Sequence, residues 1–154
     1  PAVEELQSSL ADKDSAVRYW GTLGILMRGK EGVSAHIEPL KAALQDSSPA
    51  VRIVVAQALA DHGGDTVRAQ ALAVLGELAV PKDQGVLVAM SALAAIEALG
   101  PKAASLHGRI ASLDPKGPSP GNRYDSYVPR LIANIIPDAK ANAEPGDPKA
   151  KKKR

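Results

Sequence analysis

Two aspartate–arginine pairs contain the residues whose types and spacing could support chemistry in this chain. Asp12 is followed by Arg18, and Asp46 is followed by Arg52 at the same spacing. A carboxylate close to a guanidinium could bind an anion or take part in acid–base catalysis. However, one constant offset relates the first pair to the second, as it relates the elements of a fold repeat, and so we interpret both pairs as structural. We expect each aspartate to accept backbone N–H groups at the start of the next helix, and each arginine to bond a neighbouring repeat.

The other reactive residue types form no recognisable site. His36, His62 and His107 are scattered along the chain, with no histidine one helical turn away and no carboxylate cluster nearby, so no metal site is predicted. Cysteine is absent, which excludes disulfides and thiolate ligands. There is no Ser-His-Asp arrangement and no glycine-rich phosphate loop. The sequence therefore predicts no catalytic, cofactor-binding or metal-binding residue.

The net charge of +2 is a property of the C-terminal end of the chain. The last six residues, Lys149 to Arg154, carry five positive charges. Without them the chain has 14 basic against 17 acidic side chains, a net charge of −3, which argues against nucleic acid as a partner of the folded body. Residues 137–154 lose apolar periodicity and gain Pro, Gly and Lys, and so we interpret them as a disordered basic tail in solvent.

A repeat of helical hairpins would position the aspartates and arginines. The segments 10–20 and 44–54 align without gaps. In the second, apolar residues follow the spacing of a buried helix face, at Val51, Val54, Val55, Ala58 and Leu59. A weaker third copy contains Asp83 and Val88, and a degenerate fourth copy covers residues 127–131. We therefore expect helix from about residue 3 to 113, another helix over 127–136, and no sheet.

Glycine and proline mark where these helices should stop. Gly29, Gly63 and Gly100 end the first three copies, at positions where a helix C-cap favours φ > 0. Residues 114–126 form a Pro/Gly loop before the last helix. The predicted folded domain is thus 1–136, and no apolar run within it reaches the length of a membrane span.

The aromatic residues are few, and we assign them by helix face. Phe is absent, and there are three Tyr and one Trp, so packing must rely on the close approach of alanine-rich faces. Trp20 follows Val17 at the spacing that puts both on the same helix face, which predicts that it packs in the core. Tyr19 is expected to point elsewhere, towards solvent.

The pattern Leu-x-Asp-x-x-x-x-Val-Arg, present at Leu10–Arg18 and Leu44–Arg52, resembles HEAT repeats of a short type. The resemblance implies an all-α fold of the ARM/HEAT type, an α-solenoid of about four stacked helical hairpins. A closer resemblance rests on Val17-Arg-Tyr-Trp-Gly21 and the glycines that follow it. This string is similar to the C-terminal HEAT extension of bacterial arylsulfatase-type enzymes, and the likeness covers about residues 3–136.

The sulfatase resemblance implies a role without catalysis for this chain. Those enzymes convert a Cys or Ser in a Cys/Ser-x-Pro-x-Arg motif to formylglycine and bind calcium through Asp and Asn residues. No such motif occurs here, so formylglycine and calcium are expected only in an upstream catalytic domain, and the protein would be periplasmic or secreted. The chain would be an accessory domain of an enzyme that acts on sulfated glycans. The alternative is a free-standing HEAT-like adaptor that binds another protein.

Overall fold

The computed structural model describes residues 3–124 and 126–136, and within them it is helical and contains no strand. The predicted all-α class is therefore confirmed for this part of the chain. The first elements are α1 (Val3–Ser9), α2 (Ser15–Leu26), α3 (Gly29–Ala35), α4 (Ile37–Ala43) and α5 (Pro49–His62). The later elements are α6 (Asp65–Leu78), α7 (Pro81–Gln84), α8 (Val86–Leu99), the 3-10 helix η1 (Gly100–Leu106), α9 (His107–Ala111), the 3-10 helix η2 (Pro120–Asn122) and α10 (Tyr127–Ile135).

The repeat of the sequence is visible in the helix boundaries. The offset that relates Asp12 to Asp46 also relates both ends of α1 to those of α4, and the start of α2 to the start of α5. Asp14 caps α2 because its carboxylate accepts the N–H of Ala16 at 2.8 Å. In α5 the first helical residue is Pro49, whose fixed φ suits that position.

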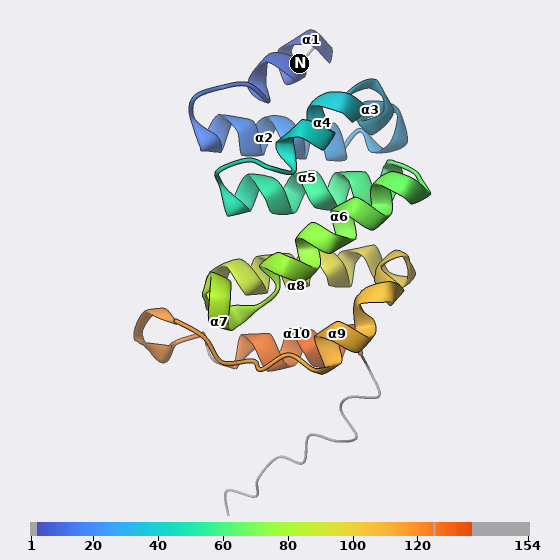
Figure 1. Cartoon of the computed structure of the whole chain (residues 1–154). Helices are drawn as coiled ribbons and strands as arrows, with labels where there is room; N and C mark the ends of the chain where they lie inside the picture. The colour runs from blue at the N-terminus through green and yellow to red at the C-terminus, as the bar shows by residue number, and fades with distance from the viewer. Residues whose placement is uncertain (1–2, 125, 137–154) are drawn as a thin grey trace, which may run out of the picture.

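Four helices pack one after another in a single row. Helix α2 packs against α5, α5 against α8, and α8 against α10 (Figure 1). The other helices lie beside this row: α1 contacts α2, α4 contacts α5, and α6 contacts both α5 and α8. Each helix of the row thus contacts the next one, and each is preceded in sequence by shorter or oblique helical segments.

The core is made of aliphatic side chains along this row, as the apolar spacing predicts. Val51 and Val54 of α5 are 1% and 4% exposed, and Val55, Ala58 and Leu59 are fully buried. On α8 the residues Ala92, Ala95, Ile96 and Leu99 are buried at the same spacing, whereas Val88 is only half-buried. The alanines allow close approach: among the fully buried residues are Ala56, Ala58, Ala60, Ala71, Ala89, Ala92 and Ala103.

Three predictions about single residues are wrong, and two of them concern the aromatic pair Tyr19 and Trp20. Trp20 is not in the core: its exposed fraction is 67%, while Tyr19, expected at the surface, is half-buried against the core. The reason is that α1 contacts α2 through Gly21 and Gly24, where added Cβ atoms would lie 2.6 Å from Ser9 and 3.1 Å from Leu6. Helix α1 therefore lies over the two glycines on this face and leaves the Trp20 side chain exposed.

The other incorrect prediction concerns a glycine. Gly63 has φ −81°, an ordinary helical value, and it is Gly64, with φ +84°, that makes the turn and precedes α6. The turn thus needs its flexible residue one position later than the repeat spacing indicates. Gly29 and Gly100 do have positive φ, of +62° and +52°.

The Pro/Gly loop packs against the start of α8 instead of lying free. The amide of Val86 donates a hydrogen bond to the carbonyl of Pro118 at 2.9 Å. Gly117 lies so close to Pro81 that an added Cβ would be 2.1 Å from the Pro81 carbonyl oxygen. This loop follows α9 in the sequence, and it nevertheless fixes the junction between α7 and α8.

One helical stretch differs from the expected absence of a membrane-length run. Residues Val86–Ala111, which join α8, η1 and α9, are long and apolar enough to cross a membrane by length and composition, with a mean hydropathy of 1.5 in the most apolar window. The stretch is interrupted at Gly100, and α8 packs against α5, α6 and α10. This arrangement is that of a core helix, whose apolar residues contact other helices.

Candidate binding groove

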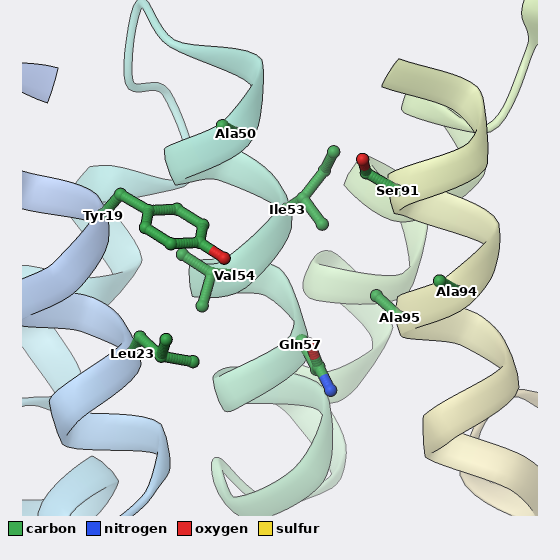
Figure 2. Close-up of a pocket in the computed structure, with 9 residues that line it drawn as sticks. All are labelled: Tyr19, Leu23, Ala50, Ile53, Val54, Gln57, Ser91, Ala94 and Ala95. Carbon is green, nitrogen blue, oxygen red and sulfur yellow. The ribbon is translucent and has the colours of Figure 1, made fainter. Parts of the chain in front are cut away.

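A groove of about 490 Å³ opens along the row, over α2, α5 and α8 (Figure 2). It combines apolar walls with polar groups at its edge. Its lining consists of Tyr19, Leu23, Ala50, Ile53, Val54, Gln57, Ser91, Ala94 and Ala95. A volume of this size is in the range of ligand pockets and of grooves for short peptide segments.

Helix α5 builds the middle of the groove, because consecutive residues of a helix point about 100° apart. Val54 points back towards Tyr19 and Leu23 of α2, and Ile53 points forward towards Ser91 of α8 (Figure 2). The neighbouring lining residues from α5 and α8 are alanines, which leave the space open. The shape of the groove thus follows from α5, which directs one large side chain towards α2 and another towards α8. The small alanine side chains between them leave the groove open.

The groove carries no charged side chain in its lining. Its polar groups are the phenol of Tyr19, the amide of Gln57 and the hydroxyl of Ser91, which donates a hydrogen bond to the Leu87 carbonyl at 3.1 Å. Such a surface favours an apolar segment with a few hydrogen-bonding groups over an anion. Chemically, the groove is suited to binding, since the residues that line it include no general acid, base or nucleophile arranged as a pair.

The first aspartate–arginine contact joins two successive helices of the row, as predicted. Arg18 of α2 donates from Nε and Nη2 to the two carboxylate oxygens of Asp46 at 2.6 and 2.8 Å. The same carboxylate accepts the N–H of Ser48 at 2.8 Å, in the turn before α5. The side chains of Arg18 and Asp46 are 13% and 9% exposed. Hydrogen bonding to Arg18 lowers the pKa of Asp46 below its ordinary value, against the opposing effect of burial.

Arg52 also has structural partners, and the one in a neighbouring element is Glu77 of α6. Its Nε donates to the Leu44 carbonyl, at the end of α4, at 3.1 Å, and its Nη2 donates to Glu77 of α6 at 3.2 Å.

The sequence reasoning missed a third arginine of the same type. Arg68 of α6 donates to the Ala60 carbonyl at 2.9 Å, in the helix before it, just as Arg52 bonds Leu44. An arginine in the first turn of a helix was the available signal for Arg68.

The three histidines are not brought together. His36 is buried, and its Nδ1 lies 2.7 Å from the Gly32 carbonyl. His62 Nε2 lies 3.4 Å from Asp61, which also pairs with Lys102, while His107 begins α9. In the ranges 3–124 and 126–136, no group of three or more His, Cys, Asp or Glu is placed to hold a metal ion. The predicted tail 137–154, with its basic end, lies outside the described residues.

Neither a family model, nor a curated protein, nor a solved structure matches this chain. The resemblances to HEAT repeats and to sulfatase extensions therefore stay predictions. The groove itself was not predicted, because the sequence indicates which helix faces are apolar but not where small residues leave a space between helices.

Proposed function

We propose that this chain is a non-catalytic scaffold, an α-solenoid of HEAT-like hairpins. The observation that carries the proposal is the row α2, α5, α8 and α10, whose first two helices are joined by the contact of Arg18 with Asp46. This contact joins the arginine of the first sequence copy to the aspartate of the second, which supports stacking of the two copies. Stacked units of this kind present extended surfaces that hold other proteins.

Within this reading, the chain is the C-terminal accessory part of a bacterial sulfatase. The support comes from the string Val17–Gly21 and the repeated Asp…Val-Arg pattern, which are similar to such extensions. The accessory domain would pack against the catalytic domain, stabilise it, or shape access for a sulfated glycan. Calcium and formylglycine would belong to the catalytic domain, and the protein would be periplasmic or secreted.

The test of the sulfatase reading is the reading frame upstream of Pro1. A Cys/Ser-x-Pro-x-Arg motif in frame, together with aryl sulfate hydrolysis by the full polypeptide and none by residues 1–154 alone, is the expected result. Hydrolysis by this chain alone, from a preparation free of contaminating enzyme, would contradict it. If the complete reading frame lacks the motif, the sulfatase reading is wrong and the scaffold proposal stands without it.

The groove over α2, α5 and α8 favours a second function, that of an adaptor for a protein segment. Its apolar walls and uncharged polar groups suit an amphipathic helix or an extended peptide. The variant Ser91→Trp would fill the groove from an exposed position on α8. We expect it to weaken partner binding at least tenfold while the unfolding temperature stays unchanged, and Ser112→Trp, outside the groove, to have no effect on binding.

A further inference from the structure

The outer face of α2, at the start of the row, exposes large apolar side chains. Trp20 is 67% and Val17 is 39% exposed. The equivalent residues of α5, at the same repeat offset, are Val54 and Val51, and they are 4% and 1% exposed. The two positions of α2 are thus exposed, whereas the matching positions of α5 are covered by a neighbouring helix.

What covers α5 is known from the structure. Val54 faces Tyr19 and Leu23 of α2, the preceding helix of the row (Figure 2). Helix α1 is the repeat equivalent of α4, and it meets α2 at Gly21 and Gly24, beside Val17 and Trp20 on the same face. No helix among the described residues takes the place on α2 that α2 itself takes on α5. The face of Val17 and Trp20 is therefore the place at which one more helix of the row would lie.

A second observation, from the polar contacts, points to the same neighbour. Asp12 accepts the N–H of Asp14 at 2.7 Å, as Asp46 accepts that of Ser48 at 2.8 Å, so both carboxylates are held in the same turn. Asp46 then binds Arg18 from the preceding helix. In the described part of the chain, no arginine or lysine forms an ion pair with Asp12. Arg18 reaches the backbone carbonyl of Asp12, at 2.9 Å, and so, within the described residues, the Asp12 carboxylate lacks the arginine partner that Asp46 has.

The other end of the row does not match this face, which argues against a second copy as the neighbour. At α10 the positions equivalent to Tyr19 and Leu23 are occupied by Arg130 and Asn134, counted from Val128 as the partner of Val17. Both are exposed, and Arg130 lies over the ring of Tyr127 at 5.8 Å. A polar outer face is typical of the end of a helical stack.

We propose that the face of Val17 and Trp20 receives a helix from the segment of the same polypeptide that precedes Pro1. This helix stacks on α2 as α2 stacks on α5, with apolar side chains over Trp20 and an arginine bound to Asp12. The proposal rests on the proposed function as part of a longer, HEAT-like protein. It does not require that the longer protein be a sulfatase, and so the two can fail separately.

The experiment is cysteine protection in the full polypeptide, measured by maleimide labelling and peptide mass spectrometry. This chain has no cysteine of its own. Val17→Cys is the probe, and Met27→Cys is the matched control, because Met27 is 81% exposed and its equivalent in α5 is the polar Asp61. We expect labelling at position 17 to be at least ~10-fold slower than at position 27 in the full polypeptide, and comparable at both positions in residues 1–154 alone.

A stability measurement supports the labelling if the probe perturbs the interface. Trp20→Glu should lower the unfolding temperature of the full polypeptide by at least about 4 °C and leave that of residues 1–154 unchanged, since a charge is buried only in the former. Equal labelling at positions 17 and 27 in the full polypeptide would overturn the proposal. So would a reading frame that starts at this chain, or protection in residues 1–154 that rises with concentration, which would indicate a second copy.

Discussion

At the scale of single residues, the contact between Arg18 and Asp46 shows how the periodicity of a sequence can identify a structural pair. An acid–base pair for catalysis has no reason to recur with the period of the fold, whereas a contact between stacked helices has. The two-pronged geometry of the guanidinium also explains why arginine stands there, since both carboxylate oxygens accept from it. The chemistry of this pair is used for packing.

Removing the charge of Asp46 should show how much its pair with Arg18 contributes to the free energy of unfolding. In Asp46→Asn the amide oxygen can still accept the N–H of Ser48, but the charged pair with Arg18 is lost. We expect the free energy of unfolding at pH 7 to fall by about 1–3 kcal/mol, because hydrogen bonds to charged groups in sheltered positions are strong. Urea unfolding measures the difference, and Asp83→Asn, at the matching but exposed position of the third copy, should leave it unchanged.

The same pair makes stability depend on pH in a defined direction. Arg18 lowers the pKa of Asp46 in the folded state, below the value of about 3.9 for an unperturbed aspartate. The stabilisation is therefore complete at neutral pH and is lost as the pH falls through the folded-state pKa. Wild type and Asp46→Asn should converge in urea midpoint towards pH 3, and a constant difference from pH 7 to pH 3 would contradict this assignment.

Arg52 allows another residue-scale prediction, in which charge is kept and geometry is lost. A lysine at this position cannot reach both the Leu44 carbonyl and Glu77 in the way the guanidinium does. Arg52→Lys should lower the free energy of unfolding by about 0.5–1.5 kcal/mol, the typical value of one hydrogen bond. Arg123→Lys, at an exposed site, is the control. A fully stable Arg52→Lys protein that no longer binds a partner would instead indicate a binding role.

At the scale of elements, helix type and the buried face of α5 were predictable from the sequence, but the neighbours of each helix were not. The 3.6-residue pattern places Val17, Trp20, Val51 and Val54 on equivalent faces, and it is the same for a covered and an uncovered helix. The pattern therefore placed Trp20 on the correct face of α2. It could not show that the side chain would stay exposed there, and so the assignment to the core was wrong. For the same reason, the groove over α2, α5 and α8 could not be predicted, because it depends on the depth left between helices.

Valine truncations test this distinction directly within one chain. Val51→Ala and Val54→Ala should each cost about 1–3 kcal/mol of unfolding free energy, from lost burial and a small cavity. Val17→Ala, at the equivalent place of α2 but 39% exposed, should cost clearly less in residues 1–154. Denaturant midpoints give the comparison. If Val17→Ala cost as much unfolding free energy as Val51→Ala, another part of this chain would cover the face of α2 that carries Val17.

At the scale of the whole molecule, charge and fold are separable. The positive net charge comes from residues 149–154, while the remaining sequence is slightly acidic. The ion pair of Arg18 with Asp46, whose side chains are mostly shielded from solvent, carries no net charge. Binding to polyanions, if present, is therefore expected to come from the basic segment and not from the helical row.

Deleting residues 149–154 tests that separation. The helical circular dichroism and the unfolding temperature should not change, because five of these six residues are basic and only Ala150 is apolar. Retention on a heparin column at low salt should disappear, since such binding depends on the release of counterions by clustered Lys and Arg. Lys82→Gln, at an exposed site of the helical body, serves as the control and should elute like the wild type. Retention that survives the deletion would place an anion site on the helical body.

The loop contact at Pro118 also has a consequence for the order in which the molecule can be assembled. Most helices contact helices close to them in sequence, so packing of α1 to α6 needs only residues already synthesised. The amide of Val86 is different, because its acceptor, the Pro118 carbonyl, lies beyond α9 in the sequence. On a ribosome, this hydrogen bond can form only after the loop has emerged. Until it does, the first half of the row can already be packed while the junction at Gly85 is still open to proteases.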